Sequence, residues 1–121
     1  MGAQPAKEDL EARYQRAVEL RLNGEYEEAI REFDAILEAD PNHIEARHER
    51  ALAYCFTGLF DESIAELEKL RELAPEFLLG RLTLGRTYVM LGMNDEAKAE
   101  FEFVLSRDPE NEEALKHMAY F

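Results

Sequence analysis

The side chains that could perform catalysis are few and poorly spaced. The sequence has one Cys and three His among 121 residues. His43 and His48 are five residues apart, whereas a metal-binding pair on one helix needs the i, i+4 spacing, and His117 is distant. Cys55 has no cationic neighbour in the sequence that would stabilise a thiolate. We therefore expect no enzyme activity, no metal and no cofactor, and interpret Cys55 as an inert, partly buried thiol.

Carboxylates are abundant, but they recur too regularly to indicate a catalytic pair. A periodic row of Glu side chains is typical of a solvated helix face, where a carboxyl lacks the shifted pKa that acid-base catalysis needs. The six glycines form neither a Gly-x-Gly-x-x-Gly nor a Walker loop. The recurring carboxylates that we assign to this face are Glu27, Glu28, Glu32, Glu62, Glu66, Glu96 and Glu100.

The overall charge excludes several classes of partner. The chain has 14 Lys and Arg against 27 Asp and Glu, a net charge of -13, which disfavours nucleic acid and anionic membrane surfaces. Its longest apolar run, residues 51–56, is far shorter than the ~20 residues that span a bilayer. A 46% hydrophobic composition favours a folded chain. With no signal segment and a single Cys, we expect a cytoplasmic protein.

The sequence repeats itself at an offset of 34 residues. Three copies lie end to end without gaps, at residues 10–43, 44–77 and 78–111. In each copy a Gly supplies the left-handed conformation that ends one helix, and a Pro cannot continue the next helix. Five columns are identical in all copies: Arg13/Arg47/Arg81, Gly24/Gly58/Gly92, Glu28/Glu62/Glu96, Glu32/Glu66/Glu100 and Pro41/Pro75/Pro109.

Apolar residues between these columns recur at helical spacing, so each copy is predicted to be a pair of helices joined by a tight Gly turn. Short connections require consecutive helices to pack antiparallel. We expect a flexible segment at residues 1–8 and a single all-α domain of seven helices at 9–121. The first helices are expected near 9–23, 44–57 and 78–91, the second near 26–38, 60–73 and 94–106, and the last over 110–121.

These residues resemble the tetratricopeptide repeat (TPR) family, whose pattern runs Trp-x2-Leu-Gly-x2-Tyr, then Ala-x3-Phe, then Pro. The resemblance covers nearly the whole chain and implies an α-solenoid, a right-handed superhelix whose concave surface is lined by the first helices. It also implies a non-catalytic protein-interaction module. The third copy matches best, with Leu84, Gly85, Tyr88, Ala97, Phe101 and Pro109.

One departure from the family pattern is the Arg13/Arg47/Arg81 column, which stands at the family's Trp position. In one interpretation the aliphatic stems pack between helices while the guanidinium groups reach solvent or nearby Glu side chains. In the other, the column is an anion-binding row, which would have to overcome the negative field of the protein.

Repeat positions 5, 9 and 12 form one stripe on each first helix, and in this family that stripe faces the concave side. Here the stripe and its neighbours are unusually apolar for so charged a chain, which indicates a groove for a peptide with apolar anchors. The alternative is that these side chains cover one another, or that other parts of a longer protein cover them. The candidate groove residues are Tyr14, Val18, Arg21, Leu22, His48, Leu52, Cys55, Phe56, Leu79, Leu82, Arg86, Val89 and Met90.

A known branch of the family holds chaperone C-termini through a carboxylate clamp of Lys and Asn. That clamp is absent here, so we expect chaperone tails to be poor ligands and a more apolar peptide to fit better. The matching positions hold Tyr14, Val18, Leu52, Leu79 and Thr83.

The last expected helix ends on Tyr120 and Phe121, although a terminal repeat normally needs a polar outer face. Either the sequence is cut from a longer repeat array, or this end pairs with another molecule. The alternative function is therefore structural self-assembly through the C-terminal helix, with Tyr120 and Phe121 as the contact residues of a homo-oligomer.

Overall fold

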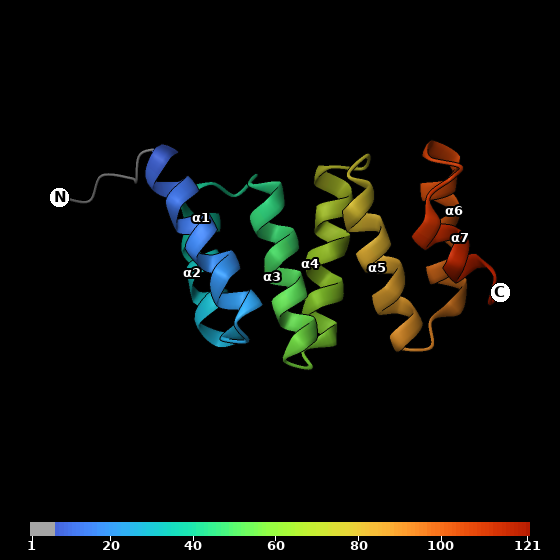
Figure 1. The fold of residues 1–121 in the computed structure, drawn as a ribbon, viewed down its shortest axis with the longest axis horizontal. Coiled ribbons are helices and arrows are strands. Elements are labelled where there is room, and N and C mark those ends of the chain that lie inside the picture. Colours follow the sequence, from blue (N-terminus) through green and yellow to red (C-terminus); the bar gives the residue numbers. More distant parts are fainter. Residues whose placement is uncertain (1–6) are drawn as a thin grey trace. The chain divides into compact units, whose positions relative to one another are not determined.

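The computed structural model describes residues 7–121, and within that range the chain forms helices and no strand (Figure 1). The seven helices confirm the all-α prediction and follow one another through short connections. Their bounds are α1 Lys7–Leu22, α2 Tyr26–Ala39, α3 Ile44–Phe56, α4 Phe60–Leu73, α5 Leu78–Met90, α6 Asn94–Arg107 and α7 Glu112–Met118.

The helix bounds differ from expectation mainly at the two ends of the chain. Helix α1 begins at Lys7, inside the segment expected to be flexible, while residues 1–6 lie outside the described part. Helix α7 covers only seven residues. It begins after Asn111, whose side chain accepts a hydrogen bond of 2.9 Å from the Ala114 amide, and it ends at Met118, before the expected end at residue 121.

The Gly column has the predicted role of ending the first helix of each pair. Gly24, Gly58 and Gly92 have φ values of 83°, 79° and 75°, in the left-handed region that side chains with a Cβ rarely adopt. Each glycine stands two residues before the start of α2, α4 or α6, and only three residues separate the two helices of each pair, so the chain reverses direction within them. This reversal places α2 antiparallel to α1 in the first unit and α6 antiparallel to α5 in the second, as Figure 1 shows.

The chain divides into two compact units, residues 1–66 and 67–121, with the boundary inside α4. A single domain over 9–121 therefore remains a prediction. In the first unit α2 packs against both α1 and α3, and α1 also contacts α3. The core of this unit consists of Ala17, Ala29, Phe33, Ile36, Leu37 and Ala46, with Leu10, Tyr14, Val18 and Leu20 packed against it.

The second unit is built on the packing of α5 against α6, and of α6 against α7. Gly85 permits the close approach of α5 and α6, because a Cβ at this position would lie 2.7 Å from Cζ of Phe101. Phe101 is completely buried, and its ring stacks on His117 of α7 with centroids 4.6 Å apart. The small residue and the large ring are thus complementary, as the repeat pattern predicts.

Candidate functional site

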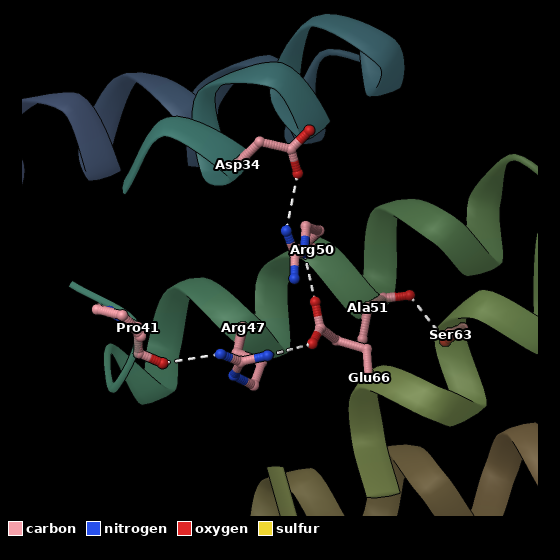
Figure 2. Close-up of polar contacts among 7 residues, drawn as sticks. All are labelled: Asp34, Pro41, Arg47, Arg50, Ala51, Ser63 and Glu66. Carbon is pink, nitrogen blue, oxygen red and sulfur yellow. Dashed lines mark hydrogen bonds and ion pairs between the residues drawn. The ribbon is translucent and has the colours of Figure 1, made fainter. Parts of the chain in front are cut away.

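The Arg column forms a repeated ion pair with the Glu column 19 residues later. In the second copy, Arg47 Nη1 lies 2.6 Å from Glu66 Oε1, and its Nη2 donates to the Pro41 carbonyl at 2.7 Å. Arg50 pairs with the other Glu66 oxygen and with Asp34 at 2.8 Å (Figure 2). The Arg, Glu and Pro columns are therefore joined by one hydrogen-bond network.

The same arrangement recurs in the second unit. Arg81 Nη1 lies 3.1 Å from Glu100 Oε1, and Arg81 Nε donates to the Pro75 carbonyl at 3.1 Å. Arg71 occupies the second Glu100 oxygen at 2.5 Å. In the first copy the pair between Arg13 and Glu32 is 3.3 Å long and more exposed.

These contacts decide the interpretation of the Arg column. Each guanidinium group is neutralised by a carboxylate of its own repeat, which supports the stem-packing interpretation and leaves no anion-binding row. The assignment of Glu66 and Glu100 to a solvated face is wrong, since both side chains are buried. A buried carboxylate needs a charged partner. The constant spacing between the two identical columns was the signal for this pairing in the sequence.

The candidate groove residues of the first unit lie on α1 and α3, which contact each other. Tyr14, Val18, Leu52 and Cys55 are half-buried, and so retain some surface for a ligand. His48 is buried, which removes it as an exposed groove residue. Because Arg21 forms an ion pair with Glu49, its charge is compensated within the chain.

Two further candidates of the first unit, Leu22 and Phe56, lie at the edge formed by the Gly turns. Each is the last residue of its helix, α1 or α3. The Phe56 ring stacks on Tyr26, the first residue of α2, with centroids 5.1 Å apart and ring planes inclined by 11°. Phe56 is thus held against the second helix of the preceding repeat. Leu22 and Phe56 lie one helical turn beyond Val18 and Leu52, so they form the end of the first-helix stripe next to the Gly turns.

In the second unit, the candidate groove residues lie on α5. Leu79, Val89 and Met90 are exposed, whereas Leu82 is buried and belongs to the core. Arg86 is engaged: its Nη1 lies 2.9 Å from Glu113 Oε2 and its Nη2 donates to the Thr83 hydroxyl at 3.0 Å. Neither Arg21 nor Arg86 thus has a free charge for a ligand.

The Cys55 thiol and the His43 imidazole are each hydrogen-bonded within the fold. The Cys55 sulfur lies 2.9 Å from the Ser63 hydroxyl oxygen, which donates in turn to the Ala51 carbonyl. His43 Nδ1 accepts a hydrogen bond from the Ala46 amide at the start of α3, and its ring stacks on Tyr14. Within residues 7–121, no group of His, Cys, Asp and Glu is arranged to hold a metal ion. No described helix has both the length and the apolar character needed to cross a bilayer.

At the C-terminal end, the two aromatic residues differ in exposure. Tyr120 is 81% exposed, whereas Phe121 is 44% exposed. The ring centroid of Phe121 lies 6.3 Å from that of the buried Phe101. Phe121 is therefore partly packed within its own chain.

Comparison with known proteins identifies the repeat. Two tetratricopeptide repeat family models match the sequence, one over residues 20–77 and the other over residues 81–111. The chain belongs to the TPR family. A comparison with curated proteins gives no match.

Solved TPR structures cover almost the whole chain. The first TPR of Spaghetti (RPAP3) bound to the HSP90 peptide SRMEEVD has a TM-score of 0.88 at 23% identity, covering 98% of this chain and 94% of that one. The Arabidopsis OM64 TPR domain has a TM-score of 0.86 at 17% identity, covering 93% of each chain. The second TPR domain of human RPAP3, in complex with the HSP70 peptide SGPTIEEVD, has a TM-score of 0.82 at 25% identity, covering 89% and 90%. These likenesses confirm the α-solenoid class.

TPR domains are protein-interaction modules, which places this chain in that functional class. At two of the expected clamp positions, Val18 and Leu52 present half-buried aliphatic side chains in place of Lys or Asn. Tyr14 at a third position has a pKa raised to about 12, by burial first and by the negative charge of Glu49 second. Tyr14 therefore stays neutral at physiological pH and carries no charge for a carboxylate.

Proposed function

We propose that this TPR chain is a non-catalytic module that binds a peptide segment of a partner on the apolar face of its first helices. The observation that carries the proposal is the position of Val18 and Leu52, which lie half-buried on the contacting helices α1 and α3. A face that is already ordered avoids the entropic cost of ordering upon binding. In the second unit, Leu79 and Val89 give α5 an apolar surface of its own.

The partner segment is expected to use apolar anchors. Arg21 and Arg86 already form ion pairs with Glu49 and Glu113, so an acidic peptide would have to displace a carboxylate of this chain. The net charge of -13 also opposes an acidic ligand. We therefore propose that this chain does not share the chaperone-tail peptides found with its structural neighbours.

Selection from a displayed peptide library tests the proposal. Peptides selected on the wild-type protein should carry aliphatic or aromatic anchors, and should lose about tenfold or more in affinity for the Val18→Ser, Leu52→Ser double variant. The matched control, Leu73→Ser with Leu115→Ser, removes two exposed leucines elsewhere and should bind like wild type. Circular dichroism establishes that each variant is folded.

Two results would contradict this function. Selected peptides that bind the folded Val18→Ser, Leu52→Ser variant as tightly as wild type would place the site elsewhere. Tight binding of the peptide SRMEEVD would show that the chain accepts an acidic tail despite its paired arginines.

The second candidate function is self-assembly through the C-terminal helix, favoured by the exposure of Tyr120. Light scattering over a concentration series tests it. A dimer that dissociates in a Tyr120→Ser variant would support self-assembly, whereas a monomer at every concentration would reject it.

A further inference from the structure

An exposed aromatic edge lies in the first unit, at the turns that connect its helices. Leu22 and Phe56, the last residues of α1 and α3, are 68% and 58% exposed. In each case the Gly of the following turn is two residues further along the chain. A group of large apolar side chains that remains this exposed is typical of an interaction surface, and Phe56 also has an aromatic partner.

The aromatic pair in this edge has a defined geometry. Tyr26 and Phe56 stack nearly parallel, with centroids 5.1 Å apart, and thereby join the start of α2 to the end of α3. Stacking restricts the rotamers of both rings before any partner arrives. A pre-ordered aromatic surface loses less conformational entropy on binding than a free one.

Acidic side chains border the aromatic pair. A hollow of about 300 Å³ is lined by the turn and first residues of α2 together with Thr57 and Arg31. Within residues 7–121, its three carboxylates, those of Glu25, Glu27 and Glu28, form no ion pair. The helix dipole already stabilises carboxylates at a helix N-terminus, so the three glutamates indicate a ligand only together with the exposed Phe56 ring beside them.

The first unit carries most of the negative net charge of the chain. Residues 1–66 hold seven Lys and Arg and 16 Asp and Glu, which gives -9 of the total net charge of -13. A partner complementary to this edge must combine apolar side chains with positive charge. An amphipathic helix with Leu-type residues at i, i+3, i+4 and i+7 on one face and Lys or Arg on the other has both properties.

We propose that the turn edge, defined as Leu22, Glu25, Tyr26, Glu27, Glu28 and Phe56, is a docking site for a basic amphipathic segment of a partner protein. The apolar residues of the segment cover Leu22 and Phe56, and its cations face the three glutamates. This site adjoins the first-helix face, because Leu22 and Phe56 lie one helical turn beyond Val18 and Leu52. It includes neither Val18 nor Leu52, so variants of the two sites can be compared directly.

The test uses a labelled synthetic amphipathic peptide of Leu and Lys and measures its binding by fluorescence anisotropy. Phe56→Ala should weaken binding about tenfold, because it removes the central apolar contact. Glu27→Gln with Glu28→Gln should weaken it by a similar factor, and added salt should reduce that difference. A Leu and Glu peptide of the same pattern should not bind.

Matched variants separate docking at the edge from general attraction to an acidic protein. Glu38→Gln with Glu102→Gln removes the same charge from exposed positions outside the edge and should change affinity by less than about threefold. Val18→Ser with Leu52→Ser should weaken binding of this peptide less than Phe56→Ala does, because these two residues lie one helical turn away from the edge. Equal weakening by both glutamate pairs, or wild-type affinity in Phe56→Ala, would overturn the edge proposal while leaving the groove proposal intact.

Discussion

At the residue scale, the main stabilising polar feature is the repeated pairing of the Arg and Glu columns. Glu66 is 7% exposed and accepts hydrogen bonds from both Arg47 and Arg50, so its charge is compensated twice. Glu100 has the same relation to Arg71 and Arg81. A buried carboxylate with two cationic donors joins the helices that carry the three side chains, and removal of one partner leaves uncompensated charge in the interior.

We expect Glu66→Ala to lower the free energy of unfolding by about 3 kcal/mol, because Arg47 and Arg50 lose their shared counter-charge. Urea denaturation followed by circular dichroism measures the change. Glu72→Ala is the control: Glu72 lies on the same helix, is exposed, and should cost no more than about 0.5 kcal/mol. Equal effects of the two substitutions would show that the buried pairs contribute little.

Tyr14 is expected to make stability depend on pH in the alkaline range. Burial, followed by the charge of Glu49, raises the pKa of Tyr14 from 10 to about 12. As the pH rises, the Tyr14 hydroxyl therefore loses its proton in the unfolded state before it does so in the folded state. The free energy of unfolding is unaffected by this group below pH 10 and decreases between pH 10 and about 12. Denaturation midpoints of wild type and Tyr14→Phe across this range test the effect. The variant should lose less stability, and identical profiles would contradict the assignment.

At the element scale, the Gly turns decide where each helix pair folds back. Gly58 has a φ of 79°, and a Cβ added there would meet no atom within 4 Å. The requirement for Gly is therefore conformational and independent of space. Helix bounds inside the repeats could be predicted because Gly and Pro mark them locally. The short α7 was harder to predict, since its start depends on the Asn111 cap.

Replacement of Gly58 by Val should lower the free energy of unfolding by more than ~1 kcal/mol, because a β-branched residue is forced into the left-handed region. Gly58→Asn should cost less, since Asn tolerates that conformation better than other side chains. Thermal denaturation of both variants provides the comparison. If Val and Asn were equally well tolerated, the turn would not require a left-handed residue in solution.

At the scale of the whole molecule, the net charge of -13 opposes compaction through repulsion among carboxylates. The Arg column forms local pairs, but among residues 7–121 exposed carboxylates such as Glu27, Glu28 and Glu38 form no ion pair within the chain. Surface charges are screened within about 10 Å at 0.1 M salt, whereas buried pairs are screened much less. Salt should therefore weaken the repulsion more than the attraction.

The melting midpoint should consequently rise when sodium chloride is added to a low-salt buffer. Differential scanning calorimetry over a salt series measures this shift. The Glu27→Gln, Glu28→Gln variant should show a smaller rise, because it begins with less repulsion. A midpoint that falls with salt would mean that surface ion pairs outweigh the net charge.

The sequence by itself determined the repeat, the seven helices and the TPR family, because Gly and Pro columns and helical apolar spacing act over a few residues. It also located the apolar first-helix stripe, although not which members of that stripe are covered. His48 and Leu82 are buried, and Arg21 and Arg86 are paired with glutamates from other helices. Only the tertiary structure decided these points, as it did the stacking of Phe56 on Tyr26. Burial and ion pairing depend on residues distant in the chain, and periodicity within one helix does not specify which of them meet.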